Sequence, residues 1–216
     1  EGEISFAGLK DEETLNSFFK QTFYDAYAAM PNLVGEFFSN PTGNLSTVHC
    51  TPWYYKDQCL LIGDAAHGIV PFFGQGMNSA FEDCRILDEL LEQFDDDWHK
   101  ILPAFFKARK QNTDAVAAMS MMNYSEIQHK IRDEKFNLKK ELQQELMHRY
   151  PERYVSMHVL VMFTNTPYQI AKATGEIQEQ FLQKITARVN SLAEMDWQWV
   201  DKEMQAYDKK LADLVA

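Results

Sequence analysis

Apolar residues recur every three to four positions over most of this chain, the spacing that places them on one face of an α-helix. Over residues 11–30 this pattern predicts a helix that Pro31 ends, and a second short helix is predicted over 33–38. The acidic run at 95–97 interrupts the pattern once. Beyond residue 75 the same spacing predicts helices over 76–94, 99–131, 133–149, 166–190 and 196–214.

Two shorter segments carry a strand pattern instead. Residues 44–55 alternate in polarity and are rich in Thr, Val, Trp and Tyr, which predicts a strand. The apolar run Cys59–Ile62 has the length and composition of a short buried strand. Because helical patterns dominate everything that follows, we expect an α/β front followed by an all-α carboxyl-terminal domain.

Composition narrows the possible functions. A length of 216 residues with 45% hydrophobic residues suffices for a packed core. A net charge of −11 argues against a nucleic-acid partner, because phosphate contacts need a basic face. The three cysteines, Cys50, Cys59 and Cys84, are too scattered for a disulfide framework or a zinc site, so we expect a reducing compartment and no metal. The apolar run 158–163 is far shorter than the roughly 20 residues of a membrane span.

Candidate chemistry is concentrated in residues 59–84. Gly63 allows a sharp turn after the predicted strand, and Asp64 follows at the end of that strand, where α/β sheets bind ligands. A carboxylate there can accept hydrogen bonds from the hydroxyls of a sugar or sugar alcohol. The alternative is that Asp64 only caps the turn or helix that follows. We expect His67 to be a packed structural histidine, because the sequence shows no nucleophile or carboxylate at a spacing that would make it catalytic.

A glycine-rich loop follows in the same stretch. Gly74-Gln75-Gly76-Met77-Asn78 opens a predicted helix, whose free N–H groups favour a negatively charged group nearby. The aromatic corner 71–73 can form one wall of a ring-binding pocket, or it can be ordinary core.

These residues carry a family resemblance. Gly63-Asp-Ala-Ala-His67, Pro71-Phe-Phe-Gly-Gln-Gly-Met-Asn78 and Phe81-Glu-Asp83 together resemble the second flavin-binding motif of the aromatic-ring flavoprotein monooxygenases. Met122-Asn-Tyr-Ser-Glu126 extends the resemblance into the helices, and it is closest to the members that hydroxylate L-kynurenine. It implies FAD and NADPH as cofactors, molecular oxygen as co-substrate, and formation of 3-hydroxykynurenine in tryptophan catabolism, the kynurenine pathway and NAD biosynthesis.

The resemblance also implies a role for each motif residue. Asp64, beside the Gly63 turn, would hold the ribityl chain of FAD, and the N–H groups of the 76–78 helix start would face the flavin pyrimidine edge. Asn123 would reach the amino-acid end of the substrate, and His158 stands where family members often have a tyrosine. Because the flavin carries the chemistry, no side chain is expected to be catalytic. The implied cofactor set is Gly63, Asp64, Pro71, Gly74, Gln75, Gly76, Met77 and Asn78, and the implied substrate set is Pro71, Phe72, Gln75, Asn123 and His158.

The family pattern further implies how the chain is organised. Residues 1–58 would complete a substrate-binding region, 59–97 would hold the second FAD motif and its helix, and 98–216 would form the helical domain. The family's Rossmann-type Gly-x-Gly-x-x-Gly segment, and the arginine and tyrosine expected on the substrate carboxylate, are missing. We therefore expect a carboxyl-terminal half, inactive alone, whose partner is the amino-terminal Rossmann half.

The resemblance also bears on location. Eukaryotic relatives carry a membrane segment after the helical domain, which holds them on the cytosolic face of the mitochondrial outer membrane. The tail 195–216 of this chain is charged and amphipathic instead, so we expect a cytoplasmic protein.

Two other functions remain open at this stage. One is a sister flavin hydroxylase that acts on a different aromatic acid. The other is a non-catalytic helical interaction domain, in which the glycine loop is merely a turn.

Overall fold

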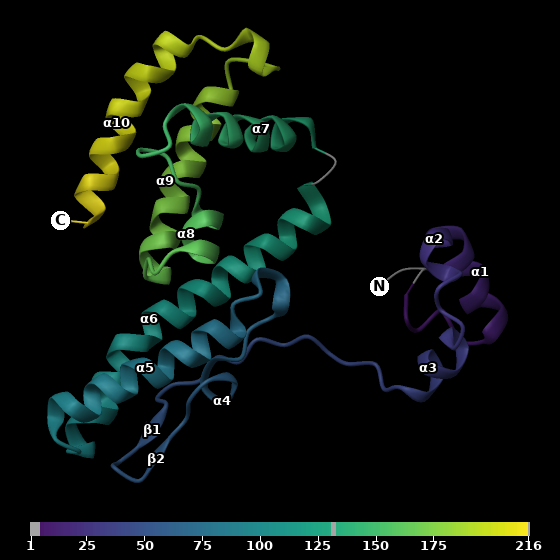
Figure 1. Ribbon diagram of the computed structural model, residues 1–216, viewed down its shortest axis with the longest axis horizontal. Helices are drawn as coiled ribbons and strands as arrows, with labels where there is room; N and C mark the ends of the chain where they lie inside the picture. The colour runs from purple at the N-terminus through teal and green to yellow at the C-terminus, as the bar shows by residue number, and fades with distance from the viewer. Residues whose placement is uncertain (1–4, 131–132, 216) are drawn as a thin grey trace. The chain divides into compact units, whose positions relative to one another are not determined.

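The computed structural model describes residues 5–130 and 133–215 of the chain (Figure 1). The chain forms two compact units, which divide between Leu45 and Ser46. The three-part division expected from the family pattern stays a prediction, because it concerns the organisation of a longer protein.

The amino-terminal unit is a small group of helices: α1 (Glu12–Thr22), α2 (Tyr24–Tyr27) and α3 (Leu33–Ser39). Asp11 caps α1 by accepting a hydrogen bond from the Thr14 N–H at 2.8 Å. The single helix predicted over 11–30 is interrupted at Phe23, whose backbone leaves the helical region at φ −130°, ψ 47°. The ring of Phe23 turns back against that of Phe18, with 5.9 Å between the ring centroids.

Sheet structure in the described residues is limited to one antiparallel hairpin in the larger unit, formed by β1 (Tyr54–Tyr55) and β2 (Cys59–Leu60). The strand predicted over 44–55 is therefore wrong except for its last two residues. Pro52 interrupts that segment and has no N–H to donate to a ladder. The run Cys59–Ile62 is not a buried strand either, because Cys59 and Leu61 are exposed.

Helices make up the rest of the larger unit. The helices predicted after residue 75 are confirmed to within a few residues at each end, except that residues 131–132 lie outside the described range. The predicted helix over 99–131 continues from α6 into one π-helical turn, η2, and the short helix α8 was not expected. The elements are α4 (Asp64–His67), η1 (Pro71–Phe73), α5 (Gly76–Phe94), α6 (Trp98–Ser125), η2 (Glu126–Lys130), α7 (Glu134–Arg149), α8 (Met157–Phe163), α9 (Tyr168–Thr186), η3 (Leu192–Glu194) and α10 (Trp197–Val215).

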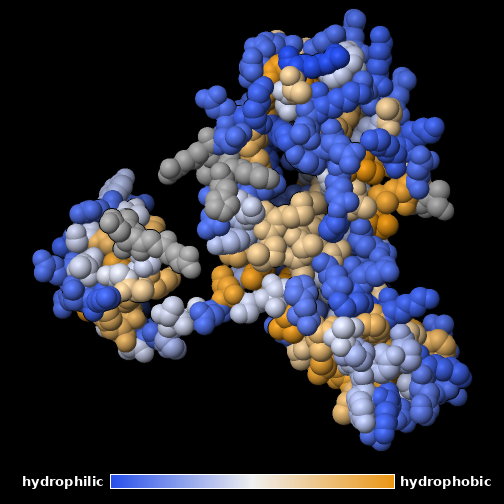
Figure 2. Space-filling view, turned by 180° about the vertical axis from the view of Figure 1, so that it is seen from behind, coloured by the Kyte–Doolittle hydropathy of each residue, from blue (hydrophilic) through white to orange (hydrophobic). Residues whose placement is uncertain are grey.

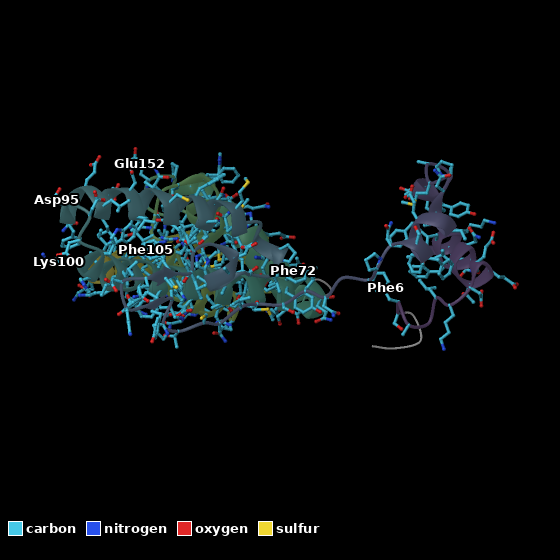
Figure 3. All side chains as sticks on the ribbon, turned by 90° about the horizontal axis from the view of Figure 1, so that it is seen from below. Phe6, Phe72, Asp95, Lys100, Phe105 and Glu152 are labelled. Carbon is cyan, nitrogen blue, oxygen red and sulfur yellow. The ribbon has the colours of Figure 1, made fainter. Side chains whose placement is uncertain are left out.

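The acidic run ends α5 as predicted. Asp95 and Asp96 adopt left-handed backbone conformations, with φ of 48° and 57°, and this tight turn folds α6 back along α5. In Figure 3, Asp95 and Lys100 lie at this turn, whereas Phe72 lies near the opposite end of the two helices. The loop that precedes α5 is thereby placed beside the carboxyl-terminal part of α6.

Three hydrophobic clusters hold the larger unit together. One surrounds Trp53 and Phe105 between the hairpin and the α5–α6 pair. The second joins η1, α6, α8 and α9 around Phe73 and Met119, and the third joins α7, α9 and α10 around Leu142. Figure 2 shows hydrophobic residues gathered over the middle of the larger unit, while hydrophilic residues dominate its ends. Among the described helices, none is both long and apolar enough to cross a bilayer.

Candidate functional site

Asp64 lies on a sharp turn directly after the hairpin. Gly63 directly precedes α4, and its backbone has φ 59° and ψ −141°. Residues other than glycine rarely adopt this conformation. Asp64 is the first residue of α4 and is exposed, and no hydrogen bond to its carboxylate occurs among the described residues. The alternative that Asp64 caps the helix is therefore wrong. Its carboxylate is available to a ligand.

Behind this turn lies a fully buried carboxylate, Asp83 of α5. Its Oδ2 atom accepts a hydrogen bond from the Gly63 N–H at 2.9 Å and lies 2.6 Å from Nε2 of His67. Its Oδ1 atom accepts from Nε of Arg109 at 2.7 Å. His67 is 6% exposed, so the expected structural role is confirmed, but its carboxylate partner lies 16 residues away and was not foreseen.

The protonation of Asp83 follows from these contacts. Burial raises the pKa of its carboxyl group, but the hydrogen bonds from His67, Arg109 and the Gly63 N–H outweigh burial and leave the pKa below its ordinary value. Asp83 is therefore ionised at neutral pH and can only accept hydrogen bonds. Nε2 of His67 must then carry the proton in this contact.

Arg109 extends the network to the start of α5. Besides Asp83, the guanidinium donates to the Ser79 carbonyl at 3.2 Å and pairs with the Glu82 carboxylate at 2.7 Å. Only 1% of the Arg109 side chain is exposed. Arg109 was not among the predicted residues, although its position gave a signal, because it falls four residues after the buried Phe105 on the apolar face of α6.

The first turn of α5 presents unpaired backbone donors. Gly74 adopts the left-handed conformation, with φ 67°, and a side chain built on it would meet open space. The helix then begins at Gly76 without a side-chain cap, and the N–H groups of Gly76, Met77 and Asn78 have no hydrogen-bond partner within the described residues. Free N–H groups at a helix start favour a negatively charged or carbonyl-rich ligand.

These features fit FAD. The free amides suit the carbonyl-bearing pyrimidine edge of a flavin, and a free carboxylate at Asp64 suits the hydroxyls of its ribityl chain.

The side chain of Gln75 points into the protein. It is 2% exposed, and its Oε1 atom accepts hydrogen bonds from Tyr168 Oη and Asn78 Nδ2, both at 3.0 Å. Its Nε2 atom lies 3.1 Å from the sulfur of Met162. Gln75 therefore links the loop before α5 to α8 and α9.

The aromatic corner 71–73 is fastened to α6. Ser120 Oγ donates to the Val70 carbonyl at 2.6 Å, and Asn123 Nδ2 donates to the Phe72 carbonyl at 2.5 Å. The ring of Phe72 packs on that of Tyr124 with 4.4 Å between the centroids. The predicted substrate residue Asn123 thus contacts the corner itself.

A cavity of about 170 Å³ opens on the far side of the corner. Phe73, Asn123 and His158 line it, and the rings of Phe73 and His158 lie 5.3 Å apart. Its wall also carries charges of both signs from η2, α7 and α9, among them the Glu126–Lys140 pair at 3.3 Å. The close packing of α8 on α9 at this wall depends on Gly175, because a Cβ there would lie 2.3 Å from the Met157 sulfur.

The structure therefore brings the predicted residues together in two groups. Asp64 and the amides of 76–78 lie on the two segments that the buried Asp83–Arg109 pair connects. Asn123 and His158 line the cavity together with Phe73, which was not in the predicted substrate set, whereas Pro71 and Phe72 are not part of the cavity lining. Gln75 and Asn78 line a separate open groove between α5 and α8.

Comparison with known proteins identifies a domain over the segment that carries these residues. A model of an FAD-binding domain matches residues 21–98, which include the turn, the loop and α5. A kynurenine 3-monooxygenase of Legionella pneumophila (strain Corby) is 64% identical over 215 residues, covering all of this chain and 48% of the relative. Over its whole length the chain is therefore similar to proteins named kynurenine 3-monooxygenase.

More distant relatives show the same partial coverage. The kynurenine 3-monooxygenase of Flavobacterium johnsoniae is 42% identical, and the match covers 86% of this chain and 42% of the relative. That of Dictyostelium discoideum is 38% identical, and the match covers 86% of this chain and 43% of the relative. The chain thus spans about half the length of the curated relatives it matches, and it corresponds to their carboxyl-terminal half.

Proposed function

We propose that this chain is the carboxyl-terminal half of an FAD-dependent, NADPH-using monooxygenase that hydroxylates L-kynurenine to 3-hydroxykynurenine. The observation that carries the proposal is that the exposed carboxylate of Asp64 and three amides at the start of α5 all lack a hydrogen-bond partner among the described residues. Both lie in the segment that matches an FAD-binding domain. The similarity to kynurenine 3-monooxygenases over the whole chain supports the substrate.

Each group of residues has a role in this proposal. Asp64 accepts hydrogen bonds from the ribityl hydroxyls of FAD, and the N–H groups of Gly76, Met77 and Asn78 donate to the flavin pyrimidine edge. When bound, the flavin would supply the redox chemistry, in which NADPH provides the electrons and molecular oxygen accepts them and provides the oxygen atom. The preorganised amides favour negative charge at the edge they face.

The cavity beside the corner receives the substrate. Phe73 and His158 offer ring faces, and Asn123 offers an amide at the cavity wall. An amino acid carries both an ammonium and a carboxylate, and the opposite charges of Glu126 and Lys140 at the same wall suit such a zwitterion. Residues of η2, α7, α8 and α9 form much of the cavity wall and would limit the access of water to a bound ring.

The test uses a joined protein, in which the amino-terminal half of the Legionella pneumophila relative precedes Glu1. We expect it to bind FAD and turn yellow, to oxidise NADPH when L-kynurenine is added, and to form 3-hydroxykynurenine detectable by mass spectrometry. A joined protein that folds but is colourless once unbound FAD has been removed would contradict the proposal. It would favour the helical interaction domain instead.

Two further predictions from the sequence depend on this experiment. If FAD binds but another aromatic acid is hydroxylated faster than L-kynurenine, the chain belongs to a sister hydroxylase. The need for the amino-terminal Rossmann half is tested by assaying the chain alone beside the joined protein, because the chain alone is expected to show no hydroxylation. The cytoplasmic location stays a prediction.

A further inference from the structure

A single buried carboxylate oxygen holds both ends of the turn that presents Asp64. Oδ2 of Asp83 contacts the Gly63 N–H directly before α4 and Nε2 of His67 at the last residue of α4. Asp83 is fully buried and His67 is 6% exposed. Since α4 is one helical turn of four residues, fixing both ends fixes the direction in which Asp64 projects.

Arg109 connects this turn to the second half of the candidate flavin site. Its Nε atom holds Oδ1 of Asp83 at 2.7 Å, and its Nη2 atom holds the Ser79 carbonyl at 3.2 Å. Ser79 directly follows the three residues whose amides are unpaired. The buried Asp83–Arg109 ion pair therefore connects the Asp64 turn to the first turn of α5, because the planar guanidinium of Arg109 contacts both.

We propose that Asp83, Arg109 and His67 are positioning residues for FAD, which set the placement of Asp64 relative to the amides of Gly76, Met77 and Asn78. This inference rests on the proposed function. None of the three side chains is expected to touch the flavin, because all are buried behind the two segments. The low pKa of the Asp83 carboxyl group supports it, because the carboxylate stays ionised over the whole physiological range. Preorganisation of this kind lowers the cost of ordering a site when its ligand binds.

The test measures FAD affinity of the joined protein by quenching of flavin fluorescence, beside thermal unfolding of the FAD-free protein. His67→Leu removes the imidazole N–H that donates to Asp83. Asp83→Asn keeps an oxygen that can accept from the Gly63 N–H but removes the negative charge of the carboxylate. We expect each to raise the FAD Kd by about tenfold or more. His67→Gln retains a side-chain N–H donor and is expected to restore most of the affinity.

Leu142→Ala is the matched control. Leu142 is fully buried in the cluster of α7, α9 and α10, so its truncation lowers the unfolding temperature without touching the network. We expect its FAD Kd to stay within about twofold of the parent. The inference is overturned if His67→Leu and Asp83→Asn bind FAD as the parent does, or if Leu142→Ala loses as much affinity as they do. A parent protein that binds no FAD would instead contradict the proposed function.

Discussion

Replacing Asp64 by alanine in the joined protein should raise the Kd for FAD by about 10- to 100-fold, because a hydrogen bond to a charged acceptor is worth about 1.5–3 kcal/mol. The unfolding temperature of the FAD-free protein should hardly change, since the exposed carboxylate makes no hydrogen bond in the described residues. Titration with FAD, followed by flavin fluorescence, measures the effect.

Asp88→Ala provides the control for this substitution. Asp88 is an exposed residue of α5, so Asp88→Ala changes the net charge of the protein by the same amount as Asp64→Ala. We expect its FAD affinity to match that of the parent. Equal affinities of Asp64→Ala and Asp88→Ala would remove Asp64 from the site.

Arg109→Met should lower the free energy of unfolding of the chain by about 3–5 kcal/mol. The substitution leaves Asp83 fully buried with one charged partner fewer, and it also frees the Ser79 carbonyl and Glu82. Urea unfolding followed by circular dichroism measures the change, because most of the helical signal comes from the larger unit.

Arg85→Met is the comparison for this prediction. Arg85 pairs with Glu89 on the exposed face of α5 at 2.6 Å, and exposed pairs contribute only about 0–1 kcal/mol. The two arginines thus make similar contacts at very different burial. If both substitutions cost the same, the network around Asp83 is not what stabilises the Gly63 turn.

The helices were predictable because their apolar residues follow the helical period, and one apolar face per helix is what packing requires. The β1–β2 hairpin was not predictable in this way. Residues 44–55 alternate like a strand, yet Pro52 has no N–H to donate, and among the described residues only Tyr54 and Tyr55 of this segment belong to a strand. An alternating pattern shows that a segment is extended, but partners for its backbone must come from elsewhere in the fold.

The site was predictable only in part. Local rules pointed to Gly63, to Gly74 and to the free amides at the start of α5, because turn geometry and helix ends are set by neighbours in sequence. The contact between Asp83 and Arg109 joins residues 26 positions apart on two helices, and no local pattern encodes it. The contact of Gln75 with Tyr168 joins residues 93 positions apart and was likewise not predictable from local patterns.

Hydrogen exchange of individual amides in the joined protein, with and without FAD, tests the central claim most directly. The amides of Gly76, Met77 and Asn78 have no hydrogen-bond partner among residues 5–130 and 133–215, so bound flavin should slow their exchange by about tenfold or more, whereas the amides of the turn at Asp95–Asp97 should be unaffected. Saturation with FAD that leaves exchange at 76–78 unchanged would contradict the account.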